Sequence, residues 1–209
     1  MVDPQKGFTD HAGSLAKANG SDEIGPSIAV VTLLETILKG LRTGGVRTLL
    51  VRSEYVPGQF TAGRLDHPLS HLCVPNANVD CEWTNALEDF QADSVVTKHE
   101  IDAMTAPQYQ AAVSRCVAQG AREICFAGFQ FTTCVAETAL STRIGLKSQC
   151  PRCIVVQPLT GSRRSSYEAS GRAVSRVAQT VEKLLRLDVE VVAEVPPVLR
   201  GYVACQGIV

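Results

Sequence analysis

The sequence predicts an α/β fold in which helices cover both faces of a mainly parallel sheet. Short segments rich in β-branched residues alternate along the chain with amphipathic helical patterns, and glycine or proline marks several of the boundaries. Strands and helices that alternate at this spacing are joined by right-handed crossovers, which give parallel pairing. The 209 residues suit one domain, so we expect a single domain over 1–209 with an extended C-terminal tail at 196–209.

Each predicted element follows from its local pattern. The predicted strands are short apolar runs typical of buried parallel strands, at 48–51, 94–97, 123–127, 153–156 and 189–192. The predicted helices have an apolar stripe at helical spacing, at 27–43, 108–118, about 132–144 and about 167–187. Residues 54–93 fit neither period, and we expect them to form loops over one end of the sheet.

Composition and charge exclude several classes of protein. The chain has 20 Lys and Arg against 21 Asp and Glu, a net charge of −1, which argues against a nucleic-acid-binding domain. No apolar run reaches the roughly 18 residues needed to span a bilayer, and the N-terminal residues lack the apolar core of a signal peptide. We therefore expect a cytoplasmic protein without a membrane partner. Its eight cysteines are then thiols, ligands or a nucleophile rather than a disulfide framework.

Chemically useful residues lie where predicted strands end. Ligands of open α/β sheets bind beyond the carboxyl ends of the strands. Asp3 ends a short N-terminal segment, Lys98 follows the strand at 94–97, and Cys134 lies in the first turn of the helix that follows 123–127. A helix N-terminus and a nearby ammonium both lower the pKa of a thiol, so we expect thiolate character at Cys134. A carboxylate could take the thiol proton, and free backbone N–H groups of the turn could hold an oxyanion.

These positions resemble the isochorismatase-like cysteine hydrolases, which include nicotinamidases and N-carbamoylsarcosine amidohydrolases. The first-strand motif of that family, Asp-x-Gln-x-x-Phe, is similar to Asp3-Pro4-Gln5-Lys6-Gly7-Phe8. Its lysine corresponds to Lys98, and its nucleophile turn, Gly-x-x-x-x-x-Cys-Val, is similar to 128–135. The resemblance covers about residues 1–195 and implies a three-layer α/β/α fold with a six-stranded sheet in the order 3-2-1-4-5-6.

The resemblance also implies a mechanism. Asp3 would act as general base and acid, Lys98 would stabilise the thiolate, and Cys134 would attack a carbonyl to give a thioester. A cis peptide bond between Phe129 and Gln130 would aim the N–H groups of Gln130 and Cys134 at the oxyanion. The implied function is hydrolysis of a C–N bond in a small amide, ureido or related substrate. Family relatives often form dimers or tetramers, so a homo-oligomer is expected.

The same comparison predicts that the chain uses no catalytic metal or other cofactor. Nicotinamidase-type members carry Asp-x-His after the second strand as part of a zinc site. This chain has Ser53-Glu54-Tyr55 there, and Glu54 with His71 is too few ligands for a site. Members that act on isochorismate lack the cysteine, so Cys134 favours an amide or related acyl substrate.

Three further interpretations stay open at this point. Phe8, Trp83 and Phe131 are candidates for lining a substrate pocket, and core packing is an equally good reading of each. The chain could be a non-catalytic binding or scaffold protein, because only Met1 and Val2 precede Asp3 in the first strand. The Cys150-Pro151-Arg152-Cys153 motif could serve thiol redox chemistry, although it leads into a strand rather than a helix.

Overall fold

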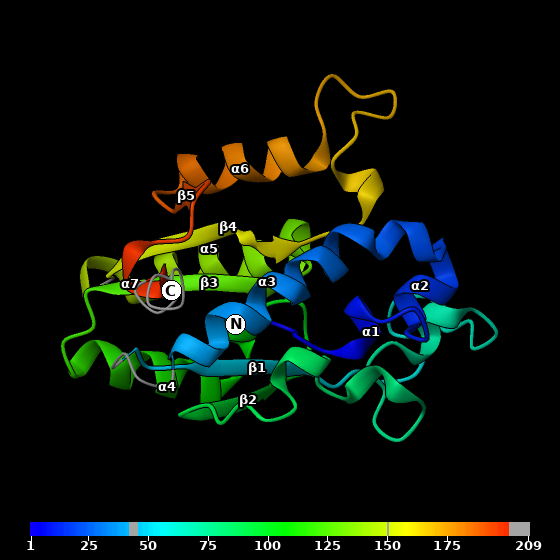
Figure 1. The fold of residues 1–209 in the computed structure, drawn as a ribbon, viewed down its shortest axis with the longest axis horizontal. Helices are drawn as coiled ribbons and strands as arrows, with labels where there is room; N and C mark the ends of the chain where they lie inside the picture. The colour runs from blue at the N-terminus through cyan, green and yellow to red at the C-terminus, as the bar shows by residue number, and fades with distance from the viewer. Residues whose placement is uncertain (42–45, 150, 201–209) are drawn as a thin grey trace, which may run out of the picture.

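The computed structural model describes residues 1–41, 46–149 and 151–200. Its strands all pair in parallel and alternate with helices, which establishes a mixed α/β fold. The strands are β1 (Leu49–Ser53), β2 (Ser94–Lys98), β3 (Glu123–Phe129), β4 (Arg152–Gly161) and β5 (Glu190–Val192). Each predicted strand is thus present, and β4 extends five residues further than its apolar run (Figure 1).

The strands form two groups, β1-β2 and β3-β4-β5, with the N-terminal segment between them. Val2 forms parallel bridges with Val51 of β1 and with Gly128 of β3. Asp3 donates its N–H to the Val51 carbonyl at 2.8 Å, and Phe129 donates to the Val2 carbonyl at 2.8 Å. The segment is too short to count as a strand, so the predicted six-stranded order is not confirmed. Its bridges nevertheless place Asp3 in the middle of the sheet.

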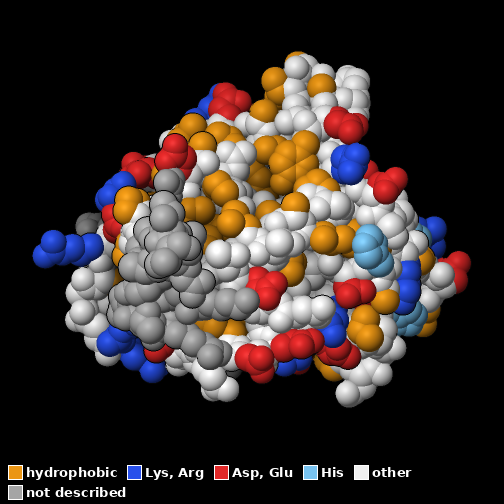
Figure 2. Space-filling model, in the orientation of Figure 1, with side chains coloured by type: hydrophobic (Ala, Val, Ile, Leu, Met, Phe, Trp, Pro, Cys, Tyr) orange, Lys and Arg blue, Asp and Glu red, His pale blue; other side chains and the backbone are white. Residues whose placement is uncertain are grey.

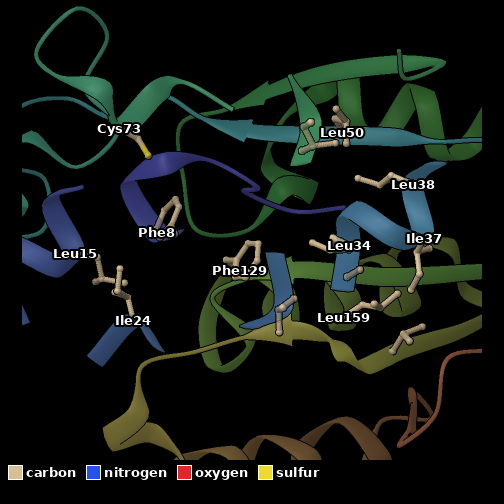
Figure 3. Packing of buried hydrophobic residues seen from close by; sticks show 14 of the residues in the cluster. Phe8, Leu15, Ile24, Leu34, Ile37, Leu38, Leu50, Cys73, Phe129 and Leu159 are labelled. Atoms are coloured by element: carbon tan, nitrogen blue, oxygen red, sulfur yellow. The ribbon is translucent and has the colours of Figure 1, made fainter. Parts of the chain in front are cut away.

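Longer helices cover both faces of the sheet because side chains along each strand alternate in direction. Leu50 and Ile154 face α3 (Gly25–Leu41), whereas Val51 and Val155 face the opposite side. That opposite side is covered by α4 (Pro107–Ala118), α5 (Ala136–Leu146) and α6 (Arg176–Arg186). Figure 3 shows the face covered by α3, where the apolar stripe of this helix packs on the side of the sheet that carries Leu50 and Phe129.

Two predicted boundaries are wrong. The last long helix begins at Arg176 rather than near Tyr167, because Gly171 has a positive φ of 80° and Ser175 caps the helix by accepting from the Ala178 N–H. The tail is not extended throughout 196–209, since Pro197–Arg200 form one helical turn, α7. The rest of the predicted tail, 201–209, and the predicted helix end at 42–43 lie outside the described residues.

Residues 54–93 form loops and short 3₁₀ turns, as predicted from the absence of a strand or helix periodicity in this segment. The turns are η2 (Pro68–His71), η3 (Val79–Cys81) and η4 (Asn85–Leu87). Much of this region lies beside α1 (Lys6–Thr9) and α2 (Ser14–Asn19) at one end of the sheet (Figure 1). It is held there by backbone hydrogen bonds, such as that from the Lys6 N–H to the Glu82 carbonyl at 2.9 Å.

Among the described residues, no helix is both long and apolar enough to cross a bilayer. On the face shown in Figure 2, acidic and basic side chains are interspersed, in line with the near-zero net charge.

A cavity of about 450 Å³ lies at the end of the sheet where the strands begin. Its walls include Leu34 and Leu38 of α3, Leu49 of β1 and Leu199 of α7. They do not include Asp3, Lys98 or Cys134, which lie at the other end of the sheet.

Candidate active site

Asp3, Lys98 and Cys134 meet at the carboxyl end of the sheet. The register pairs Ser53 of β1 with Lys98 of β2, so both strands end at one level. The Val2 bridge with Val51 places Asp3 beside that level from the other side. Cys134 follows β3 in a turn of π-helix, Phe131–Val135, that leads directly into α5.

The three side chains are sealed from solvent. Asp3 and Lys98 are 0% exposed, and Cys134 is 4% exposed. The Lys98 Nζ lies 3.0 Å from the Asp3 Oδ2, and it also donates to the Glu100 carbonyl at 3.0 Å. Burial alone would lower the pKa of Lys98, but the negative charge of Asp3, its hydrogen bond to Lys98 and the neighbouring Cys134 together outweigh burial and raise that pKa. Lys98 is therefore a fixed positive charge rather than a proton acceptor at neutral pH.

Two hydroxyl groups that the sequence analysis did not identify complete this cluster. Ser53 Oγ lies 2.8 Å from Asp3 Oδ1 and 2.8 Å from the Tyr55 hydroxyl. The Tyr55 hydroxyl in turn accepts from Lys98 Nζ at 3.0 Å and lies 3.9 Å from Cys134 Sγ. The signal that could have found them is their place at the end of β1, because the strand-end rule applies to them as it does to Lys98.

Gln5 holds the backbone of this cluster. Its side-chain amide donates to the Ser53 carbonyl at 3.0 Å and accepts from the Ser53 N–H at 2.6 Å. Both bonds are buried, so they fix the end of β1 against the N-terminal segment.

The prediction of a low thiol pKa at Cys134 is wrong. Burial raises the pKa of Cys134 to about 11, and the negative charge of Asp3 adds to the rise. Lys98 lowers this pKa, as the sequence analysis expected, but it does not outweigh burial and Asp3. In this resting arrangement Cys134 is a thiol beside an Asp3–Lys98 ion pair.

The turn that carries Cys134 has the backbone form that the resemblance implies. The peptide bond between Phe129 and Gln130 is cis. The Gln130 side-chain oxygen accepts from the Arg163 N–H at 3.1 Å, and the Thr132 N–H donates to Ser162 Oγ at 3.2 Å. The Gln130 Nε2 is a buried donor without a partner among the described residues. The hydrogen bonds to Ser162 and Arg163 show that the segment after β4 stabilises this turn.

The three candidate pocket residues pack against the core. Phe8 and Phe131 are buried in hydrophobic clusters on opposite sides of the sheet. Trp83 is half-buried against the Phe8 cluster, and the Arg52 guanidinium lies 5.7 Å from its ring centre. Their role in a substrate pocket stays a prediction.

The donors at the expected zinc position do not fit a zinc site. Ser53 and Tyr55 offer neutral hydroxyls that are already bonded to Asp3 and Lys98. Glu54 is paired with Arg52 at 3.0 Å, and His71 is exposed. Within 1–41, 46–149 and 151–200, no group of three or more His, Cys, Asp or Glu side chains could hold a metal.

The CxxC motif gains no support as a redox site. Cys153 is buried in β4, where it packs with Val155 and Val189. Cys150 lies outside the described residues.

Comparison with known proteins now decides the family. The family model of the isochorismatase domain matches residues 1–144, more than two thirds of the chain. The chain belongs to the isochorismatase family. It is accordingly an isochorismatase-like hydrolase, and the motifs around Asp3, Lys98 and Cys134 all lie inside the matched residues. No curated protein matches the sequence.

Solved structures share the fold at low sequence identity. An isochorismatase family protein from Desulfovibrio vulgaris superposes with a TM-score of 0.67 at 18% identity, covering 99% of this chain and 96% of its own. PnC1 from L. infantum, solved in complex with nicotinate, has a TM-score of 0.67 at 16% identity, with coverage of 92% and 89%. A cysteine hydrolase from Pseudomonas syringae has a TM-score of 0.66 at 18% identity, with coverage of 91% and 85%. At these identities the likeness establishes the fold alone.

Proposed function

We propose that this isochorismatase-family protein hydrolyses a C–N bond in a small amide, ureido or related substrate through a thioester on Cys134. The observation that carries the proposal is the meeting of a carboxylate, an ammonium and a thiol at the carboxyl end of the sheet. Nucleophilic acyl transfer needs a nucleophile, a group that accepts its proton and a charge that stabilises the anion formed.

The thiol proton passes to Asp3 as the reaction begins. The Asp3 carboxylate pairs with Lys98 through Oδ2, and its side-chain hydrogen bond with Cys134 gives the thiol proton a path to the carboxylate. Because the pKa of Cys134 is raised to about 11, the thiolate exists only while it attacks the carbonyl carbon. Lys98 keeps its proton and balances the negative charge as it moves between Asp3 and Cys134.

Attack gives a tetrahedral intermediate whose oxyanion is held by the N–H groups of Gln130 and Cys134. Collapse of the intermediate breaks the C–N bond, and the leaving amine takes the proton from Asp3. A water molecule then attacks the thioester while Asp3 accepts its proton. Expulsion of the thiolate and return of that proton to Cys134 restore the resting state.

The test measures ammonia release from a panel of primary amides and ureido compounds that includes nicotinamide. We expect Cys134→Ala to lower turnover by at least about 10³-fold, because no other group replaces the nucleophile. Cys125→Ala is the matched control, since Cys125 lies on β3 away from the cluster and lines the cavity at the other end of the sheet. Undiminished turnover in Cys134→Ala overturns the mechanism.

One observation favours a second function, a non-catalytic binding or scaffold protein. Asp3, Lys98 and Cys134 are almost fully buried, so a substrate reaches Cys134 only after neighbouring side chains move. Phe60 is one such neighbour, packed edge-on against Tyr55 with ring centres 4.7 Å apart. No turnover across the panel, with a folded protein, favours this alternative.

A further inference from the structure

The Tyr55 hydroxyl, which the resemblance did not identify, contacts three members of the reactive cluster. Tyr55 is 3% exposed, and its side chain reaches back over the end of β1. Its hydroxyl contacts Lys98 Nζ at 3.0 Å, Ser53 Oγ at 2.8 Å and Cys134 Sγ at 3.9 Å. Through Ser53 it is also connected to Asp3.

Counting donors and acceptors fixes the direction of these hydrogen bonds. A carboxylate only accepts, so Ser53 donates in its contact with Asp3 Oδ1, and Ser53 is also placed as the donor in its contact with the Tyr55 oxygen. An ammonium only donates, so Lys98 supplies the proton in its contact with Tyr55. The Tyr55 oxygen therefore accepts from both Lys98 and Ser53, and the acceptor within reach of its own proton is Cys134 Sγ.

The strength of this contact depends on the state of Cys134. A neutral thiol is a weak acceptor, so in the resting state the hydrogen bond from Tyr55 to Cys134 is weak. A thiolate is a charged acceptor and forms a stronger hydrogen bond than a neutral hydroxyl does. Burial raises the pKa of Tyr55, so its hydroxyl keeps the proton and remains a donor throughout.

We propose that Tyr55 is a fourth catalytic residue, whose hydroxyl donates a hydrogen bond to the Cys134 thiolate as it forms. The inference rests on the proposed function, because it assigns a role within the same thiol chemistry. Its geometric basis is separate from Asp3 and Lys98. The Tyr55 hydroxyl is buried within reach of the reacting sulfur, whereas the other hydroxyl beside that sulfur, Thr133 Oγ1 at 4.0 Å, belongs to an exposed residue.

The test follows alkylation of Cys134 by iodoacetamide as a function of pH, with peptide mass mapping, and it needs no substrate. We expect Tyr55→Phe to slow alkylation about tenfold at about pH 9, because loss of a hydrogen bond to a charged group disfavours the thiolate. Loosened packing would expose Cys134 and speed the reaction, so slower alkylation separates the hydrogen bond from a structural effect.

The matched control is Tyr109→Phe. Tyr109 is also 3% exposed, and its hydroxyl bonds Thr142 at 3.0 Å beneath α4, away from the thiol. We expect it to leave the alkylation profile unchanged. Thermal unfolding of both variants shows whether each one folds.

A second variant covers the case in which Tyr55→Phe does not fold. Tyr55→3-fluorotyrosine keeps the ring and its packing but makes the hydroxyl a stronger donor, so alkylation at about pH 9 becomes faster. Equal or faster alkylation in a folded Tyr55→Phe variant, or no acceleration by the fluorinated residue, overturns the inference. Failure of the proposed function would instead show as absent turnover with the alkylation effects intact.

Discussion

The Cys134 thiol is protonated at rest because burial raises its pKa while its two nearest charges act in opposite directions. Asp3 raises its pKa and Lys98 lowers it, and the two are paired at 3.0 Å. An ion pair acts on a third group as a dipole, so its net effect is smaller than that of either charge alone. The cost of burying an anion then sets the sign of the shift.

Removing the charge of Asp3 reverses this balance. We expect Asp3→Asn to lower the pKa of Cys134. Lys98 is then a buried cation without its counter-ion, and a Cys134 thiolate takes the place of the Asp3 carboxylate in balancing that charge. Alkylation of Cys134 at about pH 9 should then become about tenfold faster or more, while turnover falls because no group carries the proton.

Asp102→Asn is the control for that experiment. Asp102 caps a 3₁₀ turn by accepting from the Met104 N–H, and asparagine can do the same. Its alkylation profile should match the parent protein. Slower alkylation in Asp3→Asn would contradict the charge balance described above.

At the scale of elements, a close approach between β3 and the N-terminal segment positions Asp3. Gly128 has a φ of 116°, and a Cβ atom placed there would lie 2.0 Å from the Val2 carbonyl oxygen. The bridge that holds Asp3 in the sheet therefore depends on the absence of a side chain at this position.

We expect Gly128→Ala to lower the free energy of unfolding by about 2–6 kcal/mol, from backbone strain and overpacking together. It should also shift the pKa of Cys134 downward, because Asp3 is displaced with the Val2 segment. Urea unfolding and the alkylation profile measure the two effects.

Gly171→Ala measures how much of the expected loss in the free energy of unfolding comes from backbone strain alone. Gly171 has a positive φ of 80°, but nothing lies within 4 Å of a Cβ placed there. Its cost should be only about 1–2 kcal/mol, with no change at Cys134. If Gly128→Ala and Gly171→Ala lowered the free energy of unfolding equally, the contact with Val2 would add nothing to the cost of the Gly128 substitution.

At the scale of the whole molecule, the sheet divides the core into layers. One hydrophobic cluster joins α3 to Leu50, Ile154 and the cavity walls, and another packs α5 and α6 around Cys134. Stability and thiol chemistry can therefore be changed separately on the two sides.

Leu34→Ala tests this separation. Leu34 is buried in the α3 layer and lines the 450 Å³ cavity, so its truncation should lower the free energy of unfolding by about 2–5 kcal/mol. The pH profile of Cys134 alkylation in the folded variant should not move. A shifted profile would show that the two layers are coupled.

A homo-oligomer, the single domain over 1–209 and a cytoplasmic location stay predictions. Light scattering on the purified protein measures the first directly.

Much of the fold could be predicted because its signals are local. Apolar runs and helical stripes predicted the five strands of the described residues and, except for the start of α6, the bounds of the long helices within a few residues. The start of α6 differs from the prediction because its apolar stripe continues back through Val174 into a segment that Gly171 and the Ser175 cap keep non-helical. The strand-end rule, joined to the family motifs, selected Asp3, Lys98 and Cys134 as candidates.

The sequence by itself determined the alternation of strands and helices and the residue types at their ends, because both depend on neighbours along the chain. Only the tertiary structure decided the Ser53–Tyr55 contacts and the sign of the Cys134 pKa shift. Tyr55 and Cys134 are 79 residues apart, and no local pattern records that their side chains meet. Burial and net charge at a buried group are sums over everything packed around it, so they exist only once the chain has folded.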